Sequence, residues 1–189
     1  MKNTLLALLL ITYPLAVYFG LQYFEPGMLA AFFAIIFIVR HLNSPGKRGT
    51  IPHANIVLVA VLSLLTFSVL ANSALALKFY PVVMSISFLA IFGYSLYKPP
   101  SIVEIIARLR EQLDEDGIAY TRRVTQVWCG FFIVNALIAT VTIFHENEQV
   151  WLVYNGLISY VLMGLLMAGE FVVRFVVKKR NTARKANQK

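Results

Sequence analysis

Long apolar stretches recur along the whole chain and are separated by short polar segments. A helix needs about 20 predominantly apolar residues to cross a bilayer, and most of these stretches approach that length. Hydrophobic residues make up 59% of the chain and charged residues only 14%, against about 25% charged in a typical soluble domain. Because the core of a soluble protein of this length could not bury so much apolar surface, the pattern predicts an all-α, polytopic membrane protein.

We expect a single transmembrane helical domain over residues 1–177, followed by a basic cytoplasmic tail over 178–189. The second predicted span, over about 28–39, is short, so the first two apolar segments could form a tight, tilted hairpin. The start of the chain is similar to a signal peptide but lacks a small-x-small cleavage site, which predicts a retained first span. The chain is predicted to cross the membrane six times as three hairpins, over about 5–24, 28–39, 56–75, 79–97, 127–144 and 150–173.

The basic residues predict how these spans are oriented. If the N-terminus is cytoplasmic, every one of the 17 Lys and Arg residues except Lys78 falls on the cytoplasmic side. Membrane proteins concentrate Lys and Arg in their cytoplasmic loops, and one miscounted span would reverse every later loop. The pattern therefore predicts that both termini are cytoplasmic. The Lys and Arg residues cluster at the ends of the apolar segments. The net charge of +8 therefore favours anionic lipid, and not nucleic acid, as a partner of the protein.

The cytoplasmic loop 98–126 is the longest segment between predicted spans. Ser101 and Glu104 have the spacing of a capping box, and apolar residues follow at helical period, so we predict an amphipathic helix from about Ser101 to Leu113. This helix would lie in the headgroup region or pack beneath the bundle, and the acidic cluster 114–116 with Gly117 would end it. The predicted contacts with lipid are Ile102, Ile105, Ile106, Arg108 and Arg110, with Lys178, Lys179 and Arg180 in the tail.

Polar side chains recur at helical spacing along the sixth predicted span, and Asn135 lies on the fifth. Lipid offers no hydrogen bonds, so such a face should lie against other helices. The candidate polar site within the bundle consists of Asn135, Asn155, Ser159, Glu170 and Arg174. The structural alternatives to such a site are an amide contact between Asn135 and Asn155 that only holds the helices together, and an ion pair between Glu170 and Arg174.

The sequence contains no HExxH motif, no Gly-rich phosphate loop and no Ser/His/Asp arrangement. Its single cysteine, Cys129, excludes an internal disulfide framework and a multi-cysteine metal site. We therefore expect no catalytic, metal or cofactor site, and expect the protein not to be an enzyme. An enzymatic alternative would use His41, His53 or the acidic residues 114–116 at the cytoplasmic face.

Two segments carry a resemblance to a known family: Leu-Ala-Leu-Lys-Phe-Tyr-Pro at 75–81, and Arg-Arg-Val-Thr-Gln-Val-Trp-Cys-Gly-Phe-Phe-Ile-Val-Asn at 122–135. With the following span from Trp151, they resemble the intracellular septation protein A family, also called YciB-type inner-membrane-spanning proteins, as a distant relative. The resemblance implies a small multi-pass protein of the bacterial inner membrane that is linked to envelope synthesis and division.

These observations lead to two functional expectations. The first is a non-enzymatic scaffold or accessory protein in cell-envelope synthesis or division, whose partners are membrane lipids and envelope-synthesis or division proteins. The alternative is a protein that handles a lipid or polyene, either as a transporter or as an accessory subunit of a membrane acyl-transfer or biosynthetic system. In either role the chain could form a homo-oligomer.

Overall fold

The structure of the protein is a computed structural model that describes residues 14–42, 55–109 and 112–186. Every regular element in these residues is helical, as predicted, and residues 14–20 are helical. The elements that follow are α2 (Pro26–Leu42), α3 (Asn55–Ala71), α4 (Ala74–Lys78), α5 (Tyr80–Tyr97), α6 (Ile102–Arg108), α7 (Glu115–Ile143), α8 (Glu148–Val153), the π-helix η1 (Tyr154–Ile158) and α9 (Ser159–Ala186).

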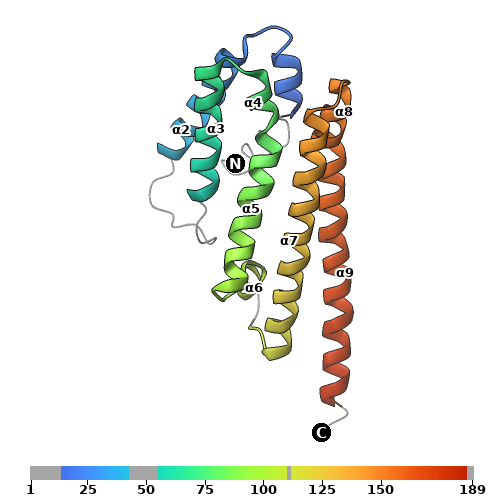
Figure 1. The fold of residues 1–189 in the computed structure, drawn as a ribbon. Helices are drawn as coiled ribbons and strands as arrows, with labels where there is room; N and C mark the ends of the chain where they lie inside the picture. Colours follow the sequence, from blue (N-terminus) through green and yellow to red (C-terminus); the bar gives the residue numbers. More distant parts are fainter. Residues whose placement is uncertain (1–13, 43–54, 110–111, 187–189) are drawn as a thin grey trace.

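The long helices lie side by side in one elongated bundle (Figure 1). Helix α5 packs against α7 and α3, and α3 packs against α2. The short helix α4 and helix α8 lie at the upper end in this view, whereas α6 and the start of α7 lie toward the lower end. Helix α9 extends furthest downward, below the rest of the bundle (Figure 1).

Three helical segments of the described chain are long and apolar enough to cross a membrane: Tyr80–Tyr97, Glu115–Ile143 and Glu148–Arg174. They contain or closely match the predicted spans 79–97, 127–144 and 150–173. Two shorter apolar helices, Pro26–Ile36 and Val59–Ala71, fall in the regions of the second and third predicted spans. Residues 5–13 of the predicted first span lie outside the described residues.

The third predicted span, 56–75, is interrupted by a turn between α3 and α4. Asn72 adopts a left-handed conformation with φ of 43°, which asparagine tolerates better than most residues. Its Oδ1 accepts a hydrogen bond of 2.8 Å from the backbone N–H of Gly27. A Cβ at Gly27 would lie only 3.0 Å from that oxygen, so this close approach favours glycine. The contact joins the first turn of α2 to the turn after α3.

Helix α7 begins much earlier than the predicted fifth span, because the acidic cluster starts a helix and does not end one. Asp114 is its N-cap, and the Asp114 carboxylate accepts a 3.0 Å hydrogen bond from the N–H of Gly117. Glu115 and Asp116 occupy the first turn, where negative charge stabilises the helix dipole. The prediction that Asp114 to Gly117 terminates the surface helix was therefore wrong.

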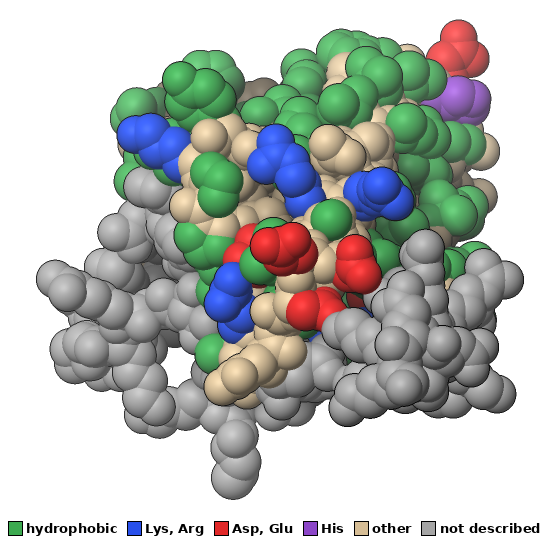
Figure 2. Space-filling model, turned by 90° about the horizontal axis from the view of Figure 1, so that it is seen from below, with side chains coloured by type: hydrophobic (Ala, Val, Ile, Leu, Met, Phe, Trp, Pro, Cys, Tyr) green, Lys and Arg blue, Asp and Glu red, His purple; other side chains and the backbone are tan. Residues whose placement is uncertain are grey.

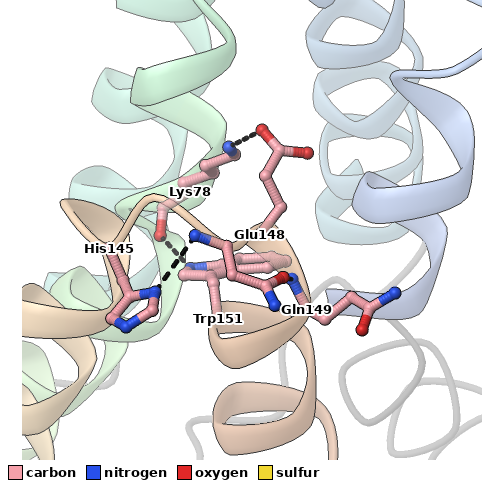
Figure 3. A network of polar contacts seen from close by, with 6 residues as sticks. Lys78, His145, Glu148, Gln149 and Trp151 are labelled. Atoms are coloured by element: carbon pink, nitrogen blue, oxygen red, sulfur yellow. Dashed lines mark hydrogen bonds and ion pairs between the residues drawn. The ribbon is translucent and has the colours of Figure 1, made fainter.

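A polar network ties α4 to α8 at the upper end of the bundle (Figure 3). Lys78 forms an ion pair with Glu148, and the Trp151 indole Nε1–H donates a 3.1 Å hydrogen bond to the carbonyl oxygen of Lys78. In the same turn, His145 Nδ1 accepts a 3.1 Å hydrogen bond from the N–H of Asn147. Trp151 is 1% exposed, so this network fixes where the last long helix enters the bundle.

A cluster of buried apolar residues draws on the segment before α2 and on α2, α3, α4, α5, α7, α8 and η1. Val17 precedes α2, Phe33 belongs to α2, and Leu65 belongs to α3; each is at most 3% exposed. Ala139 of α7 and Trp151 of α8 belong to the same cluster. By contrast, only 6% of the apolar part of Glu148–Arg174 is buried inside the bundle.

Candidate functional site

A π-helix interrupts the last long helix at Tyr154–Ile158. Such segments are rare and frequently occur at functional sites. Here the π-helix buries Tyr154 and Asn155 against the other helices. Gly156 lies close to Pro14, because a Cβ on this glycine would be 3.7 Å from the Cβ of Pro14. The sequence analysis missed this element, although its Asn-Gly dipeptide is a pair that favours departures from regular helix.

Asn135 of α7 joins three segments through its side-chain amide. Its Nδ2 donates a 2.9 Å hydrogen bond to Ser85 Oγ of α5, and its Oδ1 accepts a 3.1 Å hydrogen bond from the Tyr154 hydroxyl. Ser85 in turn donates to the carbonyl oxygen of Pro81 at 2.9 Å. Asn135 is 7% exposed and Ser85 is 5% exposed, so the network lies inside the bundle and holds α5, α7 and η1 in register.

Asn155 is 2% exposed, and its side chain forms hydrogen bonds with other described residues through its amino group. Its Nδ2 donates to the carbonyl oxygen of Trp151 at 2.9 Å and to Thr142 Oγ1 at 3.0 Å. The Thr142 hydroxyl donates its own hydrogen to the carbonyl oxygen of Ala139. A carbonyl can only accept, so the contact with Trp151 fixes which end of the amide is nitrogen. The other end, Oδ1, accepts no hydrogen bond within the described chain.

Asn135 and Asn155 both line a cavity of about 180 Å³ between α5, α7, η1 and α9, next to Pro14. The other polar side chains of its wall carry hydroxyl groups, and they are Ser85, Tyr80, Ser159 and Tyr160. Its apolar lining consists of Pro14, Pro81, Met84, Phe88, Phe132 and Met163. The described residues that line the cavity therefore carry no formal charge.

The structure brings three of the five predicted site residues together. Asn135, Asn155 and Ser159 line one cavity, and Ser159 donates a 3.3 Å hydrogen bond to the carbonyl oxygen of Asn155. The two asparagines do not bond to each other, because each amide is held by other partners. Glu170 and Arg174 lie further along α9 and do not belong to the cavity wall. The backbone oxygen of Glu170 instead accepts a hydrogen bond from the Tyr120 hydroxyl at 3.2 Å.

Several lining residues were not predicted, and Ser85, Tyr80 and Tyr160 are the polar ones among them. In α5, apolar residues occur all round the helix, so no stripe in the sequence marks the side that faces α7. The serines at 85 and 87 could have been read as buried positions, since lipid offers them no hydrogen-bond partner. Both donate to backbone oxygens within their own helix.

The predicted surface helix is shorter and more deeply packed than expected. Its capping box is present: Ser101 Oγ accepts from the N–H of Glu104, and the Glu104 carboxylate accepts from the N–H of Ser101, each at 3.4 Å. The helix ends at Arg108 and not at Leu113. Ile102, Glu104 and Ala107 are at most 5% exposed, which agrees with the alternative in which the helix packs beneath the bundle.

The predicted lipid contacts of this helix are consequently only partly accessible. Ile102 is 1% exposed, so assigning it to the lipid surface was wrong, whereas Ile106 is 44% exposed and Ile105 is half-buried. Arg108 is exposed and forms a 2.8 Å ion pair with Glu104. Figure 2 shows acidic and basic side chains gathered on this lower face. Arg110 and the side chains of Lys178, Lys179 and Arg180 lie outside what the structure describes.

Within the described residues, no group of three or more His, Cys, Asp or Glu side chains is placed to hold a metal ion. Of the residues in the enzymatic alternative, His53 and the side chain of His41 lie outside the described part. The acidic residues 114–116 form the start of α7.

Comparison with known proteins found no matching family model, no similar curated protein and no similar solved structure. The function therefore has to be argued from the residues of this chain.

Proposed function

We propose that the protein is a multi-pass membrane protein that binds a lipid-type molecule in the cavity between α5, α7, η1 and α9. The observation that carries this proposal is a cavity with mainly apolar walls, no charged group among its described lining residues, and a buried amide oxygen, Asn155 Oδ1, that has no hydrogen-bond partner in the described part of the chain. Concave, mostly apolar sites with a few convergent polar groups are typical of small-molecule binding. The size and chemistry of this site fit one end of an amphipathic molecule.

The proposed topology has six membrane crossings, with both termini in the cytoplasm of a bacterial cell. Three crossings correspond to the long apolar segments, and the other three to the helix that ends at residue 20, to α2 and to α3. The contacts between Gly27 and Asn72 and between Lys78 and Glu148 support this topology, because they hold the three turns assigned to the outer side at one end of the bundle. The opposite end carries the exposed charged residues Lys98, Arg108 and 114–116.

A lipid could reach the cavity from the side of the bundle. Tyr160 and Met163 form part of its wall but are only half-buried, and their neighbours Val161 and Leu162 are 50% and 40% exposed. In the proposed topology these exposed side chains face the acyl chains. The cavity thus lies beside the face of α9 that would contact lipid, which suits a ligand that enters from within the bilayer.

The cavity favours a lipid-handling role over a purely structural scaffold. A scaffold needs an exposed docking surface and does not require a buried amide whose oxygen accepts no hydrogen bond from the residues that the structure describes. Such an oxygen costs about 1–3 kcal/mol when it stays unsatisfied, so an occupant that donates a hydrogen bond would recover that free energy.

Filling the cavity should remove the bound lipid. We expect wild-type protein, purified in a mild detergent, to retain a defined lipid, and Ser159→Phe to lose at least nine-tenths of it because the added ring occupies the cavity. Lipid extraction followed by liquid chromatography and mass spectrometry measures the amount bound per protein. The matched control is Val161→Phe, which adds a ring to an exposed position of the same helix.

Retention by Val161→Phe at the wild-type level would show that an added ring alone does not expel lipid. If Ser159→Phe kept the wild-type amount of lipid while remaining folded, the cavity would not be the binding site. A folded wild-type protein that carries only bulk lipid, in the proportions of the host membrane, would also contradict the proposal.

A further inference from the structure

We infer that the ligand of this cavity is an uncharged lipid that carries a free hydroxyl group, and that this hydroxyl donates its hydrogen to Asn155 Oδ1. The inference rests on the proposed function, because it assigns the chemical class of molecule that the proposed site would select. It is carried by the hydrogen-bonding groups of the cavity wall and by the absence of charge among the described lining residues.

The first step is the hydrogen-bond account of Asn155. An asparagine side chain offers two N–H donors and one oxygen acceptor. Both donors are used, by the carbonyl oxygen of Trp151 and by Thr142 Oγ1. The acceptor is not used by any described residue. The amide therefore lacks a donor, and it requires one from whatever shares its surroundings.

The second step concerns charge. The described lining residues provide only amide, hydroxyl and apolar groups, and an uncompensated charge within a membrane is costly. Lys78 lies two residues before Tyr80, but its ammonium group is already paired with Glu148. A carboxylate, phosphate or quaternary amine would thus be buried without a counterion. The hydrogen-bond donor must come from a neutral group, and in membrane lipids that group is most simply an alcohol.

The third step separates a lipid alcohol from a water molecule. A single water on Asn155 Oδ1 could find the about two to four polar partners that a buried water typically needs, but it would leave the part of the cavity lined by Phe, Met and Pro side chains empty. The volume of about 180 Å³ also exceeds what one water fills, because a cavity of about 150 Å³ can hold benzene. A hydroxyl attached to a hydrocarbon chain satisfies the oxygen and fills the apolar remainder with the same molecule.

The test uses two isomers of equal composition, 1-hexanol and methyl pentyl ether, of which only the alcohol donates a hydrogen bond. Dissociation constants are measured by ligand-detected NMR on the full chain after delipidation, with empty micelles as the blank and hexanoate as a charged probe. We expect wild type to bind the alcohol about tenfold more tightly than the ether, as the value of one buried hydrogen bond predicts.

Asn155→Leu replaces the amide with an apolar side chain of similar volume, and should reduce the preference for the alcohol to about onefold. The matched control is Thr142→Val, which removes one partner of the Asn155 amino group and leaves Oδ1 unchanged, so the tenfold preference should persist. Wild type and Thr142→Val decide the question even if Asn155→Leu does not fold. In the lipid extract, the mass of the retained molecule distinguishes an acylglycerol from a prenol or another lipid alcohol.

Equal affinities of wild type for the alcohol and the ether would overturn the hydroxyl inference and leave the binding cavity in place. Binding of hexanoate as tight as that of the alcohol would overturn the requirement for an uncharged ligand. If none of the three probes bound above the micelle blank, both the inference and the proposed function would fail, and Asn155 would be satisfied by water alone.

Discussion

Replacing Trp151 with alanine is expected to lower the free energy of unfolding by about 3–4 kcal/mol, the largest effect we predict for a single substitution. The indole is 1% exposed, and its Nε1–H is hydrogen-bonded to the carbonyl oxygen of Lys78. Its removal would leave a large cavity where α8 meets α4 and would leave that carbonyl without its donor. Unfolding of the purified protein in mixed micelles with increasing SDS measures the change.

Trp151→Phe is the matched control, because it keeps most of the aromatic packing and removes only the N–H. We expect it to cost about 1 kcal/mol from the lost hydrogen bond, plus a smaller packing term. A Trp151→Ala variant as stable as wild type would mean that α8 is not held against α4 in the way the structure places it.

The second large effect is expected for Leu65→Ala in α3, which should lose about 2–3 kcal/mol. Leu65 is 0% exposed and belongs to the apolar cluster that joins α3 to α2, α5, α7 and α8. Within lipid or detergent the loss comes mainly from packing contacts and from the cavity left behind. The same unfolding titration measures it.

Leu70→Ala provides a control on the same helix, since Leu70 is 82% exposed. A substitution at such a surface position should change the stability by less than about 0.5 kcal/mol. If Leu65→Ala and Leu70→Ala had the same effect, α3 would not pack through the side that the structure buries.

The three long apolar helical segments in the second half of the chain could be predicted well, because apolar length depends on sequence alone. Boundaries set by local hydrogen bonds were harder to predict. A cluster such as Asp114–Asp116 followed by Gly117 fits either the end of one helix or the start of the next. The structure shows a start, because the Asp114 carboxylate accepts a hydrogen bond from the N–H of Gly117. The turn at Asn72 also escaped prediction, since its stabilising partner, Gly27, is distant in the sequence.

The polar face of the sixth predicted span indicated Asn155 and Ser159, and the fifth indicated Asn135. The sequence could not show which residues of this polar face line a cavity. Glu170 and Arg174 continue the spacing but lie beyond the cavity wall. The sequence also could not reveal that α5 contributes Ser85 and Tyr80 to the cavity wall, because residues this distant in the sequence come together only when the helices pack. That no described residue donates a hydrogen bond to Asn155 Oδ1 is a property of the packed structure and has no signature in the sequence.

The account depends most directly on α7 crossing the membrane, because this helix forms one wall of the cavity. The measurement is cysteine labelling with a membrane-impermeant maleimide on intact cells, in a Cys129→Ser background. Glu146→Cys follows α7, and Asp116→Cys lies in its first turn; both positions are exposed. We expect Glu146→Cys to be labelled without lysis and Asp116→Cys to be labelled only after lysis. Labelling of both positions from the same side would show that α7 does not cross the membrane, and would contradict an intramembrane cavity.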